Sequence, residues 1–196
     1  MDTAQTIFII FMAVSLSACA GIRAFLPPLA VSLLALSGHI TLAPGFDWMG
    51  RWDVAAVFGL AAMLEIIADK YPGVDHALDA AGLVLKPAMG ALLASSIITG
   101  MDPLTALCIG IIVGGGTAGI VHVGKAKVRL LSTGFTAGLA NPLLSTLEDV
   151  GAAIWTVLAI SLPYLTVLAL IVGGVLIARL LSHRRAPRSG VSTGEA

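Results

Sequence analysis

Charged residues are scarce in this chain, at 11% of its 196 residues, and aromatic residues contribute only 6%. Hydrophobic residues make up 58%, and the mean hydropathy is +0.99. These values lie far outside the range of a water-soluble domain, so the composition indicates a membrane protein whose first partner is the lipid bilayer. The formal net charge is zero, and we expect no nucleic-acid partner.

Cysteine and histidine are also sparse. Cys19 and Cys108 lie in apolar runs with no partner spacing, and we expect both to be buried small hydrophobes. The four histidines are scattered, and no two have the spacing of metal ligands. We therefore expect neither a histidine metal site nor a bound cofactor.

Long apolar runs are abundant instead. The most regular runs cover residues 52–71, 80–100, 103–124 and 164–181, and less regular ones cover 7–36, 130–147 and 150–162. About twenty apolar residues cross a hydrocarbon core of roughly 30 Å as a helix. The sequence predicts an all-α, polytopic transmembrane helical bundle of about six or seven segments. This membrane domain occupies residues 1–182, and the polar residues 183–196 are predicted to be a disordered tail.

The distribution of lysine and arginine predicts the orientation of the bundle. These residues gather at 70–86, at 125–129 and in the tail from 179 onward. Because cationic loops stay on the cytoplasmic side, the loop 38–51 and the turn 99–103 are predicted to lie outside. The C-terminus is then predicted to be cytoplasmic.

Two similar segments contain helix-weakening residues within apolar runs. AGIRAFLPPLAVSLL covers residues 20–34, and AGLANPLLSTL covers residues 137–147. Glycine and proline interrupt a helix and leave backbone groups without intrahelical partners. Such broken segments in two halves raise the hypothesis of an inverted-repeat transporter. Residues 129–147 are predicted to form a re-entrant hairpin, with Asn141 and Pro142 near its tip.

Glu65 lies about one and a half turns inside the membrane, with Asp69 on the same helical face. A lone carboxylate in lipid costs several kcal/mol, so Glu65 must be paired, protonated or in contact with a wet cavity. Arg23, the cation inside the first broken run, is its candidate partner. This pair has two interpretations: a structural ion pair, or a binding site for a cation or proton.

Two further pairs of acids lie close to these segments. Asp75 and Asp79 are one helical turn apart and could hold a divalent metal, although a solvated helix face has the same pattern. Glu148 and Asp149 follow the second broken segment and suggest a second pathway entrance lined by acidic side chains. As residues at the start of a helix they would equally favour the helix dipole.

Three motifs resemble a known family. They are AGIRAFLPPLA near the start, ExxxDKxPxxD from Glu65 to Asp75, and NPLLSTLED from Asn141 to Asp149. Over residues 15–181 the chain resembles a family of small bacterial polytopic membrane proteins classed as a domain of unknown function. This resemblance implies a bacterial inner-membrane location and brings no activity. The string EIIADK is also similar to the Glu-x-Gly-Asp-Lys motif of a cation-exchanger family, but it lacks the glycine.

Three functions follow from these patterns. The first is a small transporter or channel-like protein for a cation or a proton-coupled solute, with its site near Arg23, Glu65 and Asn141. The second is a non-catalytic scaffold or lipid-organising protein. The third is a metal-dependent enzyme acting on lipid headgroups, which we do not expect because half of the known aspartate motif is missing.

The scaffold hypothesis depends on a stripe of small residues. The segments GIIVG and GGTAG would let helices approach closely, either within the bundle or between protomers of a homo-oligomer. The glycines that form this stripe are Gly110, Gly114, Gly115 and Gly119.

Overall fold

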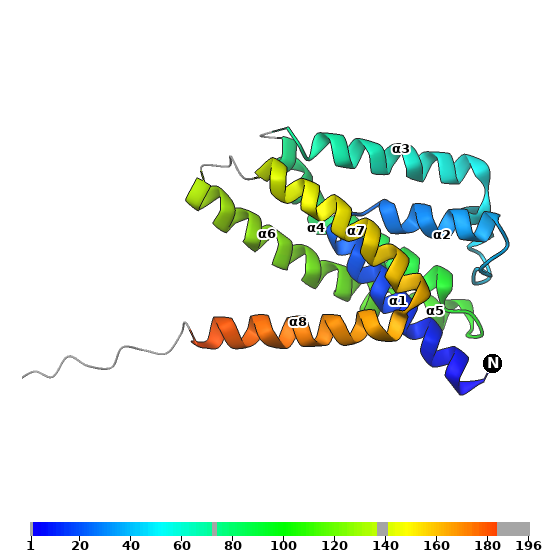
Figure 1. Cartoon of the computed structure of the whole chain (residues 1–196). Helices are drawn as coiled ribbons and strands as arrows, with labels where there is room; N and C mark the ends of the chain where they lie inside the picture. Colours follow the sequence, from blue (N-terminus) through cyan, green and yellow to red (C-terminus); the bar gives the residue numbers. More distant parts are fainter. Residues whose placement is uncertain (1, 72–73, 137–140, 184–196) are drawn as a thin grey trace, which may run out of the picture.

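The computed structural model describes residues 2–71, 74–136 and 141–183, and every regular element in this part of the chain is a helix (Figure 1). The elements in chain order are α1 (Thr3–Ile22), α2 (Leu26–Leu36), the 3-10 helix η1 (Asp47–Gly50), α3 (Trp52–Ala68), α4 (Val74–Ile97), α5 (Pro103–Ile109), the π-helix η2 (Gly110–Gly115), α6 (Gly116–Thr136), α7 (Asn141–Ser161) and α8 (Pro163–His183). Because α5, η2 and α6 are continuous, the described residues form seven helical segments besides η1. The predicted all-α fold is confirmed.

The surface and the interior are those of a helical membrane protein. Four helical stretches are long and apolar enough to span a membrane: Thr3–Ile22, Ala77–Ile97, Pro103–Gly134 and Leu143–Ser161. Many large hydrophobic side chains are exposed on the outside, whereas four charged side chains are buried: Arg23, Asp69, Lys86 and Arg129. This distribution suits a lipid solvent, in which apolar side chains face outward and ionisable groups face the bundle interior.

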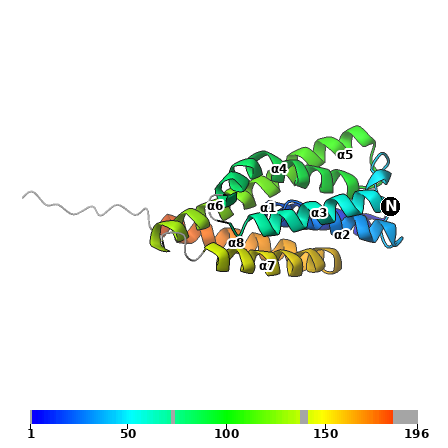
Figure 2. The ribbon, with the colours of Figure 1, turned by 90° about the horizontal axis from the view of Figure 1, so that it is seen from above.

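Helix α1 lies at the centre of the bundle and contacts α4, α6, α7 and α8. The helices run roughly along one common direction (Figures 1 and 2). Small polar side chains on α1 bond to its neighbours: Ser17 donates to the Gly90 carbonyl at 2.9 Å, and Cys19 lies 3.1 Å from the Thr156 hydroxyl. The prediction of burial is therefore correct for Cys19, but wrong for Cys108, which is exposed on α5.

The predicted break in the first apolar run is confirmed. Helix α1 ends at Ile22, residues 23–25 are not helical, and α2 begins at Leu26. Prolines follow in the first turn of α2, where a missing backbone amide hydrogen costs nothing. We call residues 22–25 the junction.

The re-entrant hairpin predicted for residues 129–147 is not confirmed. Residues 129–136 are the last turns of α6, and Asn141 begins the 21-residue helix α7. The two helices run in opposite directions along the bundle (Figure 1). The cations expected in a loop at 125–129 therefore lie on a helix, because α6 extends well beyond its apolar portion.

The glycine stripe packs inside the chain. Gly110, Gly114 and Gly115 are buried in η2, which lies against α4. The contact is so close that a Cβ added to Gly90 of α4 would lie 2.5 Å from the Gly114 carbonyl oxygen, and one added to Gly119 would lie 3.4 Å from Pro87. Three of the four glycines therefore serve packing within the bundle, which is one of the two roles that the sequence left open.

Candidate functional site

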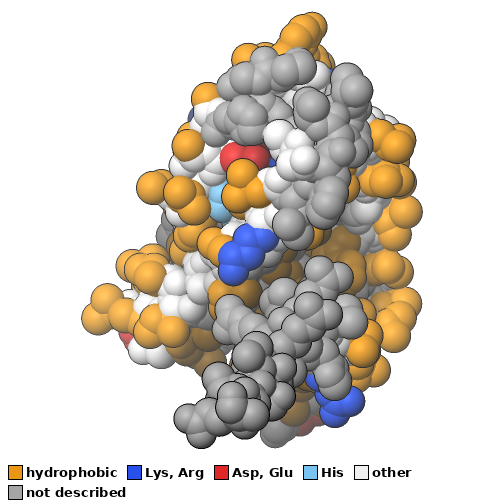
Figure 3. All heavy atoms as spheres, turned by 90° about the vertical axis from the view of Figure 1, so that its left-hand side faces the viewer, with side chains coloured by type: hydrophobic (Ala, Val, Ile, Leu, Met, Phe, Trp, Pro, Cys, Tyr) orange, Lys and Arg blue, Asp and Glu red, His pale blue; other side chains and the backbone are white. Residues whose placement is uncertain are grey.

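Helices α3, α6 and α8 finish, and α4 and α7 begin, at one end of the bundle (Figure 1). Ion pairs link charged side chains at the end of α3 and on α4, α6 and α7 in this part of the molecule. Seen from this end, hydrophobic side chains cover both flanks, and acidic, basic and histidine side chains show between them (Figure 3). We define the charged cluster as ten residues, five cations and five acids: Arg23, Lys70, Lys86, Lys125, Arg129, Glu65, Asp69, Asp79, Glu148 and Asp149.

Asp69 and Arg129 form the centre of this cluster. Arg129 donates from Nη1 and Nη2 to the two carboxylate oxygens of Asp69, at 2.6 and 2.5 Å. The Arg23 Nη2 atom lies 2.7 Å from Asp69 Oδ2, and the Ser145 hydroxyl donates to the same oxygen at 2.9 Å. Both members of the central pair are 4% exposed. Buried arginine and carboxylate groups in this planar geometry make strong, specific contacts.

The two acids of α7 extend the network. Glu148 accepts from Arg129 Nη2 at 2.8 Å and lies 3.0 Å from Lys125 Nζ. Asp149 lies 2.5 Å from Arg23 Nη2 and 2.9 Å from Lys70 Nζ. These contacts join the ends of α1, α3, α6 and α7 by ionic bonds.

The junction has partners for the backbone groups that its break releases. The Glu65 carboxylate accepts from the backbone amides of Ala24 and Phe25, at 2.9 and 3.2 Å. On the other side of the break, the Ile22 carbonyl accepts from Lys86 and Lys125, at 3.1 and 3.3 Å. Glu65 thus caps the N-terminus of α2, where the helix dipole favours a negative charge.

A cavity of about 260 Å³ lies beside the junction, and we call it the junction cavity. Its wall contains three cations and three acids: Arg23, Lys86, Lys125, Glu65, Asp69 and Asp79. The rest of the wall is mainly apolar and includes Phe25, Leu64 and Leu85. The Nε atom of Arg23 is buried without a hydrogen-bond partner among the described residues.

The structure brings five of the six residues predicted to bind a solute or ion into this region: Arg23, Glu65, Asp69, Glu148 and Asp149. The predicted ion pair between Arg23 and Glu65 is wrong. Arg23 pairs with Asp69 and Asp149, because the break directs its side chain toward α7 while Glu65 is engaged by the backbone.

The other predicted site residues have different outcomes. Asn141 is the first residue of α7, but its side chain, like that of Asp75, lies outside what the structure describes. Asp79 lines the junction cavity, and its carboxylate lies 3.6 Å from Arg129 Nη1. Among the described residues, no group of three histidine, cysteine or acidic side chains could hold a metal ion.

Sequence analysis missed five members of the site: Lys70, Lys86, Lys125, Arg129 and Ser145. In the sequence alone, these cations indicate cytoplasmic loops. A signal was present, because Lys125 and Arg129 are four residues apart and therefore share a helix face, as do Glu65 and Asp69.

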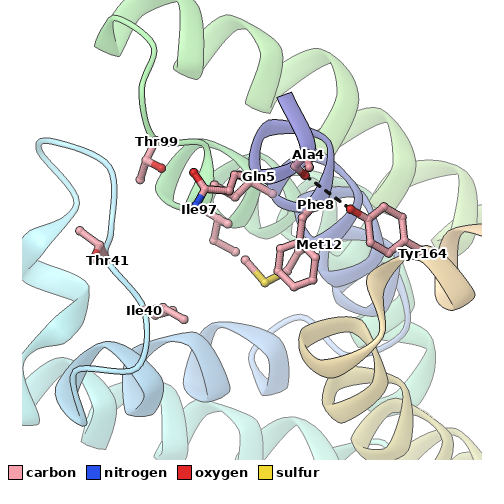
Figure 4. Close-up of a pocket in the computed structure, with 10 residues that line it drawn as sticks. Ala4, Gln5, Phe8, Met12, Ile40, Thr41, Ile97, Thr99 and Tyr164 are labelled. Carbon is pink, nitrogen blue, oxygen red and sulfur yellow. Dashed lines mark hydrogen bonds between the residues drawn. The ribbon is translucent and has the colours of Figure 1, made fainter. Parts of the chain in front are cut away.

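A second cavity, of about 570 Å³, lies near the opposite end of the bundle (Figure 4). Phe8 and Met12 of α1 line one side, and the loop residues Ile40 and Thr41 line another. The Tyr164 hydroxyl donates to the Ala4 carbonyl at 3.5 Å. The lining of this cavity contains no charged side chain among the described residues, so the two cavities differ sharply in chemistry.

The fold and the site define an all-α membrane protein with a charge-balanced interior at one end and a capped break in its central helix. The chain belongs to the family Domain of unknown function (DUF4126), which matches residues 10–183. No curated protein and no solved structure matches the chain. The resemblance drawn from the sequence motifs is confirmed at the level of the family.

Proposed function

We propose that this protein is a small membrane transporter for a proton-coupled solute, with Glu65 as the proton carrier and the junction cavity as the solute site. One observation carries the proposal. Within the described part of the chain, Glu65 is the acid of the charged cluster that has no cation within 4 Å, and its two bonds go to backbone amides beside a cavity. An intramembrane acid in such a place marks a solute or proton pathway.

The bonds made by Glu65 depend on its charge. The carboxylate accepts from two amides at once, whereas the protonated carboxyl group is a weaker acceptor and carries its own donor. Protonation of Glu65 therefore loosens its hold on the α2 N-terminus. The junction would then have two states that differ in which group satisfies these amides.

The geometry favours proton coupling over direct binding of a cation. A cation site needs carboxylates that are available to it. Asp69, Glu148 and Asp149 instead bind arginine or lysine at 3.0 Å or less. Glu65 is occupied by amides, so no acidic pocket is left for a metal among these four residues.

The proposal places the protein in the bacterial inner membrane, with the charged cluster and the C-terminus on the cytoplasmic side. Helix α8 finishes at the same end of the bundle as α3 and α6, which supports this orientation (Figure 1). An inverted repeat remains a prediction, because residues 137–140 of the second segment lie outside the described part of the chain.

A flux assay in proteoliposomes tests the proposal. The vesicles contain a pH-sensitive dye, and small anionic, cationic or neutral solutes are added outside. The dye then reports the internal pH and therefore the movement of protons. We expect the wild type to move protons with at least one solute and Glu65→Gln to lose this coupling. Asp53→Asn is the matched control, since Asp53 lies exposed in the first turn of the same helix and pairs with Arg51. Equal coupling in wild type and Glu65→Gln would refute the proposed role.

A further inference from the structure

We infer that the solute is a small carboxylate anion, which binds at the N-terminus of α2 in the place that the Glu65 carboxylate occupies. This inference rests on the proposed function and names its substrate class. The first observation is the capping itself: the chain's own carboxylate shows which chemical group accepts hydrogen bonds from the Ala24 and Phe25 amides. Helix N-termini with exposed amides bind anions of this kind.

The wall of the junction cavity supplies donors beyond those two amides. Arg23 is 1% exposed, and its Nε atom has no partner among the described residues. Lys86 is 4% exposed and donates to the Ile22 carbonyl, and the described residues place no carboxylate within 4 Å of its ammonium group. Within the described part of the chain, the Arg23 Nε atom is thus a buried donor without a hydrogen-bond partner, and Lys86 is a buried cation without a carboxylate partner. Such buried groups call for an explanation, and a bound anion supplies one.

The charge of the cavity wall follows the protonation of Glu65. The wall holds three cations and three acids, so its formal charge is zero while Glu65 is ionised. When Glu65 is protonated, three cations face two acids, and the formal charge becomes +1. The same event loosens the cap on the two amides. Uptake of one proton by Glu65 therefore frees the two amide donors and gives the cavity wall one positive charge. Both changes favour binding of one monovalent anion.

The groups that face Glu65 come from several elements. They are Arg23 at the end of α1, Cys19 within α1, Asp79 and Lys86 of α4, Lys125 of α6, and Asp69 at the end of its own helix. Asp69 and Asp79 both lie beside Arg129, so Glu65 is the acid of the wall whose charge can change without breaking an ion pair.

The size and polarity of the junction cavity restrict which anions fit it. A volume of about 260 Å³ accommodates several waters but lies below the roughly 300–1,000 Å³ of sites for drug-sized ligands. Leu64, Leu85 and Phe25 provide an apolar surface beside the charged groups. A short carboxylic acid with a small apolar end fits this wall, whereas a fatty acid exceeds it.

The transport step is balanced in charge. Glu65 takes up one proton, the carboxylate of the solute binds to the amides, and release of the solute returns the proton from Glu65. One proton and one monovalent carboxylate therefore cross together, with no net movement of charge and no covalent change.

Saturation-transfer NMR on the full-length protein in detergent micelles tests this inference, with L-lactate as the probe. This readout measures binding without membrane passage. Glu65→Gln imitates the protonated state, and we expect it to bind lactate at least about tenfold more tightly than the wild type at neutral pH. The wild type should approach the affinity of the variant as the pH falls, while Asp53→Asn should behave as the wild type.

Second-site variants test the role of the cavity wall. In the Glu65→Gln background, Lys86→Gln should weaken lactate binding about tenfold or more, and Lys86→Arg should restore it because a buried cation is retained. Thermal unfolding of each variant separates lost binding from lost folding. Two further probes serve as controls. Binding of ethylammonium measures whether the cavity accepts a small cation, and competition by palmitate against lactate measures whether it accepts the carboxylate of a lipid.

The outcomes are distinct. Equal lactate affinity in wild type and Glu65→Gln, binding of ethylammonium in place of lactate, or displacement of lactate by palmitate would overturn the inference. Proton-coupled flux of a solute other than a carboxylate would overturn it while leaving the proposed function intact. Lactate binding without any flux would refute transport and leave the carboxylate site standing.

Discussion

Two regions of the bundle hold helices together by opposite means. Between α4 and η2, backbone lies against backbone at Gly90 and Gly114, with no ionisable side chain at the contact. At the charged cluster, helices α1, α3, α6 and α7 meet through buried ion pairs around Asp69 and Arg129. Small residues are the usual means of packing helices in lipid, whereas buried charges are expensive there.

This difference shows that the chain does not need charge in order to pack. A bundle that can bring Gly90 against Gly114 could have joined α3 and α6 in the same way. Packing alone therefore does not explain why the chain buries these charged residues at a cost in free energy. The capped junction beside them gives a reason for their burial. The ion pairs surround the junction and leave Glu65, among the described residues, as the acid of the cluster without a cation within 4 Å.

The largest effect should come from breaking the central pair. Arg129→Met leaves Asp69 and Glu148 without their arginine in a buried place, and we expect a loss of about 3–5 kcal/mol in the free energy of unfolding. Thermal unfolding in micelles measures it. Arg51→Met removes an exposed arginine from its pair with Asp53 and should leave the unfolding temperature unchanged. Similar temperatures for both variants would contradict the account.

The glycine contact should respond to one added methyl group. Gly90→Ala would place a Cβ 2.5 Å from the Gly114 carbonyl oxygen, so α4 and η2 must separate, at a cost of about 1–3 kcal/mol. Gly116→Ala is the matched control, because no atom lies within 4 Å of its added Cβ and alanine favours a helix. Unfolding temperatures that do not differ between these variants would show that the contact is looser than described.

A smaller effect is expected at Ser145. Its hydroxyl donates to Asp69 at 2.9 Å and accepts from Arg23 at 3.1 Å, so Ser145→Ala removes two bonds but no charge. We expect a loss of about 1–3 kcal/mol in the free energy of unfolding, toward the lower end because the ion pairs remain. A loss as large as that of Arg129→Met would mean that the hydroxyl, and not the arginine, organises the cluster.

The smallest effect concerns Asp102, which lies in neither region and caps α5 at the opposite end of the bundle. Hydrogen bonds from Thr105 and Leu104 lower the pKa of Asp102 below its ordinary value of 3.8. A lowered pKa in the folded state means that the cap stabilises above pH 3.8 and that this contribution is lost as the pH falls through the folded value. Asp102→Asn should flatten this acid-side decrease slightly in unfolding scans below pH 4. If the unfolding temperature falls with pH equally steeply in the wild type and in Asp102→Asn, Asp102 does not contribute to the acid-side loss of stability.

The helices were predictable where residue type alone decides them. The break after Ile22 follows from Gly21 and the two prolines of α2, and α3, α5 and α8 begin at or next to a tryptophan or proline that the sequence marks. These are local effects of missing amides and backbone freedom. The extension of α6 through its cations was not predictable from hydropathy, because Lys125 and Arg129 face the protein interior and, of the three cations, only Lys127 is exposed.

The site was predictable only in part. Glu65, Asp69 and Arg23 were identifiable because each stands out in an apolar run. Their partners were not, since Arg129 is sixty residues from Asp69 in sequence and the bond depends on how α3 and α6 pack. The role of Glu65 as a helix cap depends on the same tertiary arrangement, which places its carboxylate at the N-terminus of a helix about forty residues earlier.

The most direct test of the central claim is the pH dependence of the backbone amide NMR signals of Ala24 and Phe25. If the Glu65 carboxylate caps these amides and releases them on protonation, both proton shifts will move upfield together with the titration of the Glu65 carboxyl carbon. In Glu65→Gln they will stay constant over the same pH range. Amide proton shifts of Ala24 and Phe25 that stay constant in the wild type while the Glu65 carboxyl carbon signal changes with pH would contradict the account.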